Sequence, residues 1–304
     1  NHIGVPLTLR KIKADTDIAV IEMGANHPGE IDFVCRIADP DAGLITNVGM
    51  AHLEGFGSFE GVVNTKTEMY RYLHSHSRPA LVNAANPYLM KHSDETLDRY
   101  YAAGKNALVI GHLDGNDVNI SVVWTDIAGH EYKVNTNLSG AYNLENVLAA
   151  ITAGKYFGIA DDLINKAIEG YVPSNQRSQY VKTERNEILV DLYNANPTSM
   201  KAATENMFRL KKENKVLILG DMFELGALSE QEHHLLLSRI KEMGFASVLL
   251  AGSNFYAFRQ DFPFMFFEKT EDLAGYLKEN LLSGAFILLK GSRGMKMEQV
   301  LVWL

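Results

Sequence analysis

Hydrophobic residues occur along most of the chain as short apolar runs, separated by segments with helical periodicity. A short apolar run is typical of a buried strand in a parallel sheet, and apolar residues three and four positions apart are typical of a covering helix. In the first half this pattern predicts strands at Ile18–Met23, Gly43–Val48, Ala80–Asn83 and Ala107–Ile110, and helices at Gly29–Ala38, Ser58–Leu73, Gly140–Phe157 and Ile159–Glu169. Residues Val118–Val134 alternate apolar and polar side chains and predict an antiparallel ribbon.

The alternation restarts after Tyr171–Ser178, a segment rich in Pro, Ser, Asn and Gln. The second half predicts strands at Glu187–Asp191, Lys215–Leu219, Ser247–Ala251 and Phe286–Leu289, and helices at Pro197–Lys211, Ser229–Met243, Asp272–Leu282 and the end of the chain. Asn196 is the expected N-cap of the first of these helices, with Pro197 at its first position. The pattern predicts a doubly wound α/β protein with domains at residues 1–174 and 175–304.

Composition narrows the function classes. The chain has 304 residues, 46% of them hydrophobic, and a formal net charge of −8, which argues against a general nucleic-acid-binding surface. The single cysteine, Cys35, cannot form an internal disulfide and is expected to be buried in its helix. No apolar run approaches the roughly 18 residues of a membrane span, and no signal peptide opens the sequence. We therefore expect a cytoplasmic monomer without membrane insertion.

Lys66 occupies an unusual position in the predicted helix Ser58–Leu73. Ser58 is the expected N-cap, and the apolar face comprises Phe59, Val62, Val63, Tyr70 and Leu73. Lys66 falls within that face, where an unpaired charge is unfavourable. The ammonium must therefore extend its stem to reach water, find a partner or be chemically modified, and the helix alone favours the first of these.

Polar residues follow four predicted strands, at the sheet edge where α/β proteins bind ligands. Glu22 closes the first strand and His52 follows the second; in the other half Asp191 closes one strand, and Lys290, Ser292 and Arg293 close another. Glu22 and His52 could bind a cation, and by ligand type alone either magnesium or a softer metal is possible.

Several common catalytic signatures do not occur in the sequence. There is no G-x-x-x-x-G-K-[ST], no G-x-G-x-x-G, no G-x-S-x-G, no H-E-x-x-H and no cysteine cluster. These absences argue against a dinucleotide fingerprint, a serine-hydrolase elbow and the common zinc sites.

Six motifs, in order along the chain, resemble those of the Mur ligases. They are Glu22-Met-Gly-Ala-Asn-His-Pro-Gly-Glu-Ile31, Thr46-Asn-Val-Gly-Met-Ala-His-Leu-Glu54 with Phe56-Gly-Ser58, Gly140-Ala-Tyr-Asn-Leu-Glu-Asn146, Tyr193-Asn-Ala-Asn-Pro197, Leu219-Gly-Asp-Met-Phe-Glu-Leu-Gly226 and Leu289-Lys-Gly-Ser-Arg293. The resemblance covers essentially the whole chain, and the fourth and fifth motifs are similar to those of the MurF-type branch.

The resemblance implies a central ATPase domain followed by a Rossmann-like C-terminal domain. It also implies an ADP-forming ligase of peptidoglycan synthesis, which joins D-Ala-D-Ala to UDP-MurNAc-tripeptide through an acyl phosphate. The implied cofactors are ATP, two Mg²⁺ ions and a carbon dioxide-derived carbamate on Lys66, and the implied partners are these two small-molecule substrates. The negative carbamate would explain a lysine on an apolar face, because a site with two metal ions and a triphosphate requires anionic oxygen ligands.

The resemblance assigns roles to individual residues of this sequence. Glu22, His52 and carbamylated Lys66 are the expected catalytic and magnesium-binding residues. The expected ATP-binding residues are Asn143, Asn146, Arg177, Asp191 and Tyr193. The expected substrate-binding residues are Asn194, Asn196, Lys290, Ser292 and Arg293.

The chain departs from the family in three places. Asn1–Leu9 resembles a stretch that follows the family's P-loop, so we expect the P-loop and the preceding UDP-sugar domain to be missing and residues 1–304 alone to be inactive. Tyr142 and Leu192 replace a usual histidine and a small polar residue, and we expect altered packing there. Two alternatives stay open, namely another amide ligase similar to folylpolyglutamate or cyanophycin synthetases, and a non-catalytic truncated paralogue.

Overall fold

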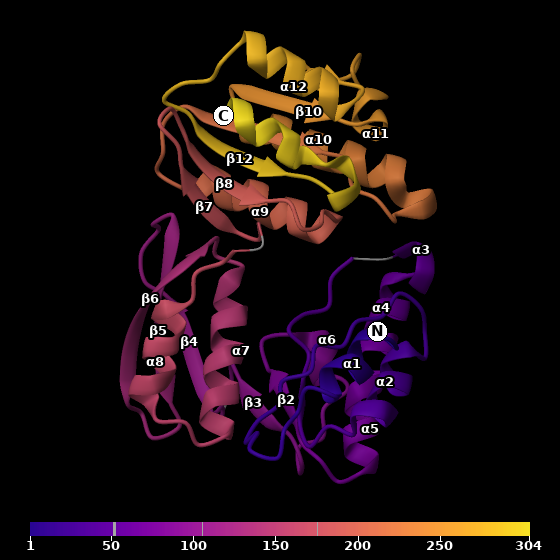
Figure 1. Ribbon diagram of the computed structural model, residues 1–304, viewed down its shortest axis with the longest axis vertical. Coiled ribbons are helices and arrows are strands. Elements are labelled where there is room, and N and C mark those ends of the chain that lie inside the picture. The colour runs from indigo at the N-terminus through magenta and orange to yellow at the C-terminus, as the bar shows by residue number, and fades with distance from the viewer. Residues whose placement is uncertain (51–52, 105, 175) are drawn as a thin grey trace. The chain divides into compact units, whose positions relative to one another are not determined.

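The computed structural model describes residues 1–50, 53–104, 106–174 and 176–304 (Figure 1). The described part of the chain contains two six-stranded sheets, with strand orders β1-β2-β3-β4-β5-β6 and β11-β10-β9-β12-β8-β7. Helices alternate with strands along most of both halves, so the predicted α/β class is confirmed.

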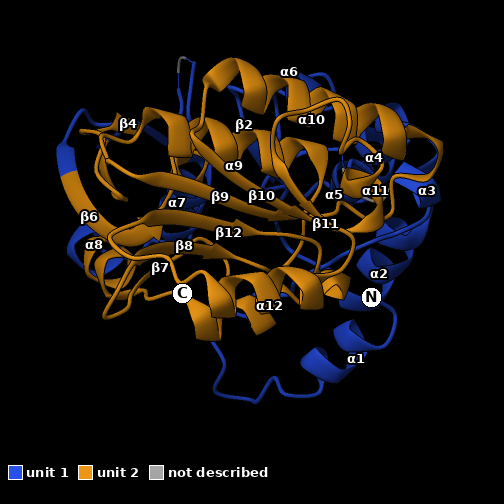
Figure 2. Cartoon of the chain, turned by 90° about the horizontal axis from the view of Figure 1, so that it is seen from above, with its two compact units in different colours: residues 1–111, 124–132, 145–164 blue, residues 112–123, 133–144, 165–304 orange. Residues whose placement is uncertain are grey.

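The chain forms two compact units (Figure 2). Unit 1 comprises residues 1–111, 124–132 and 145–164, and unit 2 comprises residues 112–123, 133–144 and 165–304. The predicted domain boundary at residues 174 and 175 stays a prediction.

The first sheet contains β1 (Gly43–Leu44), β2 (Ala80–Asn83), β3 (Arg99–Tyr101), β4 (Val109–Leu113), β5 (Asn119–Asp126) and β6 (Glu131–Ser139). Its neighbouring helices are α1 (Gly4–Leu9), α2 (Glu30–Ala38), α3 (Leu53–Phe56), α4 (Phe59–Lys66), α5 (Glu68–Ser75), α6 (Pro87–Met90), α7 (Asn143–Tyr156) and α8 (Asp161–Gly170). The strands β1, β2, β3 and β4 pair in parallel. The predicted antiparallel ribbon corresponds to the neighbouring strands β5 and β6. The connection between Asp126 and Glu131 is too short for the crossover that parallel strands require.

The predicted strand at Ile18–Met23 is wrong, because the structure has irregular backbone there. Val20 is 88% exposed and Ile18 is 41% exposed, so this apolar run is not part of a buried sheet. The predicted strand at Gly43–Val48 is shortened to β1, which pairs with β2 only through Gly43 and Leu44. A strand forms only where a neighbouring strand can hydrogen-bond its backbone N–H and C=O groups, and an apolar sequence does not show whether such a neighbour is present.

The predicted helix Ser58–Leu73 is interrupted at Thr67, which separates α4 from α5. Thr67 has φ −76° and ψ 0°, and its Oγ1 donates a hydrogen bond to the Val63 carbonyl at 2.9 Å. Such back-bonding by Thr favours a bend in a helix. The predicted N-cap is confirmed, since Ser58 Oγ accepts a hydrogen bond from Gly61 N at 3.0 Å. Lys66 is therefore the last residue of α4 instead of a mid-helix residue.

The second sheet lies entirely in unit 2. Its strands are β7 (Gln179–Lys182), β8 (Glu187–Asp191), β9 (Lys215–Gly220), β10 (Ser247–Ala251), β11 (Met265–Phe267) and β12 (Phe286–Lys290). All neighbouring pairs are parallel except β7 with β8. The helices are α9 (Pro197–Arg209), α10 (Ser229–Met243), α11 (Ser253–Tyr256) and α12 (Thr270–Glu279), with 3₁₀ turns at Gly226–Leu228, Arg293–Met295 and Met297–Trp303.

Sequence patterning predicted the interior of this second sheet but missed its two edges. The strands β8 and β10 have the predicted bounds, and α9 begins at Pro197 with the predicted Asn196 cap. The edge strands β7 and β11 were not predicted, because their side chains are only partly buried and produce no apolar run.

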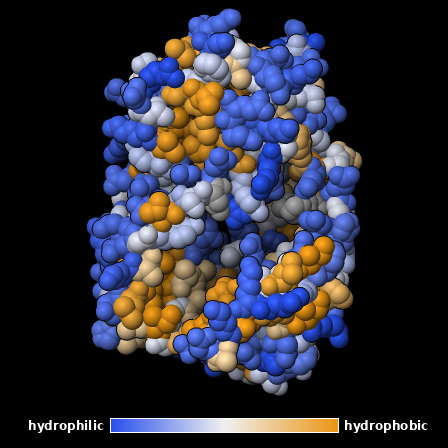
Figure 3. All heavy atoms as spheres, in the orientation of Figure 1, coloured by the Kyte–Doolittle hydropathy of each residue, from blue (hydrophilic) through white to orange (hydrophobic). Residues whose placement is uncertain are grey.

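The surface is mixed in character. In the view of Figure 3, hydrophilic residues are interrupted by hydrophobic patches. None of the helices in the described ranges is long and apolar enough to cross a membrane. Cys35 is fully buried, as expected, and burial raises the pKa of its thiol to about 12.

Asn186 provides a test of the second sheet's stability. It is 4% exposed, its Oδ1 accepts from Ala285 N at 3.0 Å, and its Nδ2 donates to the carbonyls of Leu282 and Leu304. We predict that Asn186→Ala lowers the free energy of unfolding by about 2–4 kcal/mol, because it leaves buried backbone groups without partners. Urea unfolding followed by circular dichroism measures this.

The matched control is Asn280→Ala, which removes an exposed side-chain bond to the Tyr276 carbonyl. We expect this control to change the unfolding free energy by less than about 1 kcal/mol. Equal effects of the two substitutions would contradict the stabilising role of Asn186.

Candidate active site

Lys66 is partly buried, and within the described ranges its ammonium has one hydrogen-bond partner. Its Nζ donates a hydrogen bond to the Asn47 carbonyl at 3.0 Å, from the C-terminal end of α4. No carboxylate in the described ranges forms an ion pair with it, and burial lowers the pKa of its amine. The lysine is therefore held at a half-buried position where its neutral form is favoured more than in water.

The other two expected metal ligands are placed less fully. Glu22 is exposed in the irregular segment before α2, and the structure records no ion pair between Glu22 and Lys66. His52 lies outside the described residues. Among the residues that the structure does describe, no three His, Cys, Asp or Glu side chains are grouped closely enough to hold a metal ion. The expected set, which includes His52 and a modified lysine, thus stays a prediction.

The loop that follows Glu22 is fixed by two carboxylates. Glu30 accepts hydrogen bonds from the backbone N–H groups of Asn26 and His27 at 2.7 and 3.2 Å. Glu68, two residues after Lys66, accepts from Gly29 N at 2.8 Å and Asp32 N at 3.0 Å. These bonds satisfy open N–H groups at the start of α2 and tie this loop to the start of α5.

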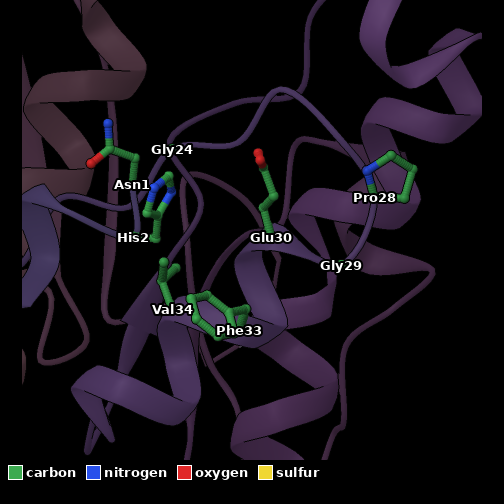
Figure 4. Close-up of a pocket in the computed structure, with 8 residues that line it drawn as sticks. All are labelled: Asn1, His2, Gly24, Pro28, Gly29, Glu30, Phe33 and Val34. Atoms are coloured by element: carbon green, nitrogen blue, oxygen red, sulfur yellow. The ribbon is translucent and has the colours of Figure 1, made fainter.

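A cavity of about 360 Å³ lies beside the same loop in unit 1 (Figure 4). Its lining residues are Asn1, His2, Gly24, Pro28, Gly29, Glu30, Phe33 and Val34. Figure 4 shows Phe33 and Val34 together on one side, with the Glu30 carboxylate directed away from them. None of the predicted site residues that the structure describes lines this cavity.

The asparagines expected to contact a nucleotide lie at the start of α7. Asn143 is 6% exposed, and its Nδ2 donates to the Ser139 carbonyl at 2.8 Å. Asn146 lies one turn further along and is exposed. Tyr142 donates or accepts a hydrogen bond with Ser178 at 2.9 Å, and burial raises the pKa of its hydroxyl. Tyr142 thus has a packing and hydrogen-bonding role of its own.

Four predicted residues of unit 2 gather at the carboxyl edge of the second sheet. Asp191 ends β8 and Lys290 ends the neighbouring β12, and the two are paired in the strand register. Lys290 Nζ lies 2.6 Å from Asp191 Oδ2 and donates to the Asn194 carbonyl at 3.0 Å. Ser292 is 3% exposed, and its Oγ accepts from Phe223 N at 2.9 Å.

Two arginines face one aromatic ring at the same edge. The guanidinium carbon of Arg177 lies 3.2 Å from the centroid of the Tyr193 ring, and that of Arg293 lies 5.9 Å from it. Tyr193 is 43% exposed, so the ring and both cations are accessible from solvent. Two guanidinium groups at an exposed aromatic ring form an arrangement that can bind phosphate or carboxylate.

The remaining predicted substrate-binding residues, Asn194 and Asn196, form local hydrogen bonds with the backbone. Asn196 caps α9 by accepting from Ser199 N at 2.9 Å, and Ser199 Oγ accepts from Asn196 N in return. Asn194 Oδ1 accepts from Ala195 N at 2.8 Å. Leu192, the departure noted in the sequence, is 5% exposed and belongs to the hydrophobic core of the sheet.

Sequence reasoning missed a buried polar group at the end of β9. Asp221 is 1% exposed and accepts hydrogen bonds from Asn254 N, Asn254 Nδ2 and Phe255 N at 2.9–3.0 Å. Its Oδ1 lies 3.7 Å from Nε2 of the fully buried His233. Gly252 has φ +123°, and a Cβ there would lie 2.2 Å from the Asp221 carboxyl carbon. Asp221 is part of the motif Leu219–Gly226, but the residues that bury and bind it, such as Asn254 and Phe255, lie far from it in the sequence.

Family models match both halves of the chain. Residues 1–154 match the Mur ligase middle domain, and residues 176–293 match the Mur ligase glutamate ligase domain. The chain belongs to the Mur ligase family. Members of this family are ATP-dependent ligases that form carbon–nitrogen bonds, and the resemblance read from the six motifs is confirmed.

Among curated Mur ligases, the chain is similar to UDP-N-acetylmuramoyl-tripeptide–D-alanyl-D-alanine ligases. It is 36% identical to that of Bacillus subtilis over 314 residues and 34% identical to that of Escherichia coli over 318 residues, covering 99% of this chain in both comparisons. It spans 67% and 68% of those proteins. A crystal structure of MurF from Acinetobacter baumannii superposes with a TM-score of 0.88 at 26% identity, covering 99% of this chain and 67% of that one.

The buried His233 of this Mur ligase gives a pH test. Burial lowers the pKa of its imidazole, although the Ser229 carbonyl and Asp221 oppose the shift. The unfolded chain therefore binds a proton at His233 more readily than the folded protein. The neutral imidazole contributes stability above the ordinary His pKa of about 6.5, and this contribution is lost as pH falls below that value. Burial raises the pKa of Asp221, whose protonation acts in the opposite sense. We predict that stability falls between pH 7 and 5 with a slope below the one-proton limit of about 1.4 kcal/mol per pH unit.

His233→Gln should reduce this slope, because Gln can still accept from Met222 N but does not take up a proton. His234→Gln is the matched control, since His234 is the exposed neighbour on α10. Urea unfolding at several pH values gives both slopes. An unchanged slope in His233→Gln would show that this histidine does not titrate with folding.

Proposed function

We propose that this chain provides the middle and C-terminal domains of a ligase that joins D-Ala-D-Ala to UDP-MurNAc-tripeptide. The observation that carries the proposal is the match along 99% of the chain to several ligases of this one specificity. The exposed Arg177–Tyr193–Arg293 group, next to Asp191 and the Tyr193–Pro197 loop, supports an anionic substrate at the carboxyl edge.

The proposed reaction has two steps. The terminal carboxylate of the tripeptide attacks the γ-phosphorus of ATP, which forms an acyl phosphate and releases ADP. The amine of D-Ala-D-Ala then attacks the acyl carbon, a tetrahedral intermediate forms, the amine loses a proton, and phosphate leaves with the C–O bonding pair. Arg177 is proposed to stabilise charge on the transferred phosphoryl group, as cations do in such transfers. Asn143, Asn146, Asp191 and Tyr193 are proposed to bind the nucleotide, and Asn194, Asn196 and Arg293 the peptide substrate.

Lys66 is proposed to act as a carbamate. The neutral amine attacks carbon dioxide, an N–C bond forms, and an N–H proton leaves, so that an ammonium is replaced by an anion. Partial burial, a lowered pKa of the amine and, within the described ranges, a hydrogen bond to the Asn47 carbonyl without an ion pair support this reaction at Lys66. Glu22, His52 and the carbamate oxygens would then supply the anionic and imidazole donors that hold Mg²⁺, and Mg²⁺ would neutralise phosphate charge.

The isolated stretch 1–304 is proposed to be inactive. It contains no G-x-x-x-x-G-K-[ST] sequence, so it offers no loop of that type to bind the β- and γ-phosphates. A polypeptide of these residues alone, compared with a natural protein that contains them together with any further domain, would test this directly.

The first experiment measures phosphate release by the natural protein that contains this chain, given ATP, Mg²⁺ and UDP-MurNAc-tripeptide. Release that depends on D-Ala-D-Ala is expected. Release that depends on glutamate instead would favour a folylpolyglutamate synthetase-like enzyme, and no release with any acceptor would favour a non-catalytic module.

For Lys66 we predict that Lys66→Ala in the same protein lowers turnover by at least about a thousandfold, because a metal-binding anion is lost. Short carboxylic acids should restore part of the activity by replacing the carbamate, and ¹³C-labelled bicarbonate should give a carbamate NMR signal only in the unsubstituted protein. Lys91→Ala, at an exposed lysine of unit 1, is the control. Unchanged turnover in Lys66→Ala would refute the role.

A further inference from the structure

Lys290 is a deeply buried charged side chain beside the proposed site. It is 1% exposed, whereas Arg177, Tyr193 and Arg293 beside it are exposed. It is the last residue of β12, whose backbone pairs with β8 on one side and β9 on the other. A soluble substrate cannot reach a side chain that water does not reach. Its burial therefore argues against the direct substrate contact that the family resemblance implies for Lys290.

The ammonium is held by two partners from one loop. Nζ lies 2.6 Å from Asp191 Oδ2 and donates to the Asn194 carbonyl at 3.0 Å. Asp191 is the last residue of β8, and Asn194 lies three positions later. The same cation thus fixes both ends of the turn 191–194, and Tyr193 lies within that turn.

Further bonds link this turn to the segment after Lys290. Ser292 Oγ lies 3.4 Å from the Ala195 carbonyl, and Ser292 N donates to the Asp221 carbonyl at 3.1 Å. On the other side, Leu192 N donates to the Gln176 carbonyl at 2.8 Å, next to Arg177. The exposed Arg177–Tyr193 pair therefore stands on backbone that Lys290 and its neighbours hold in place.

We infer that Lys290 is a positioning residue, which orients the Asp191 carboxylate and the Tyr193 ring for the nucleotide without touching any substrate. This inference rests on the proposed function, in which Asp191 and Tyr193 bind ATP. A buried ammonium suits the task, because losing it leaves Asp191 unpaired and frees the turn 191–194. Asp191 is 15% exposed at its side chain, so water can solvate it in a variant and the fold need not fail.

The test uses Lys290→Met in the natural protein, with Lys290→Arg as the conservative variant. Lys290→Met should weaken ADP binding at least tenfold by calorimetry and raise the KM for ATP by a similar factor. The KM for UDP-MurNAc-tripeptide should stay within about twofold. Lys290→Arg should restore part of the ADP affinity, since it keeps the charge.

Amide hydrogen exchange provides the structural readout. Lys290→Met should accelerate exchange at residues 192–196 and leave β9 and β10 protected. Lys201→Met is the matched control, because it breaks an exposed Lys–Glu205 pair at 3.8 Å on the neighbouring α9 and should change neither ADP binding nor exchange in the turn. If Lys290→Met does not fold, Lys290→Gln keeps a hydrogen-bond donor without the charge and should still weaken ADP binding and accelerate exchange at residues 192–196.

Two results would overturn the inference. One is a raised KM for UDP-MurNAc-tripeptide with unchanged ADP affinity, which would make Lys290 a substrate ligand. The other is unchanged ADP affinity and exchange in Lys290→Met. A failure of the proposed function looks different, because the unsubstituted protein would then show no phosphate release dependent on D-Ala-D-Ala, whereas ADP binding and hydrogen exchange would still report on Lys290.

Discussion

Parallel pairing of β12 between β8 and β9 is the constraint on which the second half of the molecule depends. It brings the carboxyl ends of these strands to one edge, and thereby places Lys290 beside Asp191. The hydrophobic interiors of the strands supply the free energy for this arrangement, while the polar residues that follow them are left to form the site. The apolar residues within each strand thus stabilise the sheet, and the polar residues at the end of the same strand form the proposed site.

The polar groups at this edge differ in burial, and the difference separates their roles. Lys290, Ser292 and Asp221 are almost fully buried and hold backbone segments to one another. Arg177, Tyr193 and Arg293 are exposed and have groups available for a ligand. A buried layer that fixes loops beneath an exposed layer that binds is the expected arrangement for a site that must hold its geometry.

In the first half, the helix break at Thr67 has a comparable effect. It makes Lys66 the end of α4 and Glu68 the start of α5, so that the lysine contacts the Asn47 carbonyl while Glu68 binds the start of α2. The residues on either side of Thr67 therefore have different roles.

The sequence alone determined the α/β class, the interior strands of the second sheet and the cap of α9, because these follow from local periodicity and local hydrogen bonding. It also determined the family, through six ordered motifs. It could not determine that Ile18–Met23 is irregular, nor the strands β3, β7 and β11, since strand pairing and partial burial depend on neighbours distant in the chain. It also could not determine the helix break at Thr67. Only the tertiary structure decided that Lys290 is buried and Arg293 exposed, because Lys290 ends β12 between two neighbouring strands whereas Arg293 lies in the turn that follows.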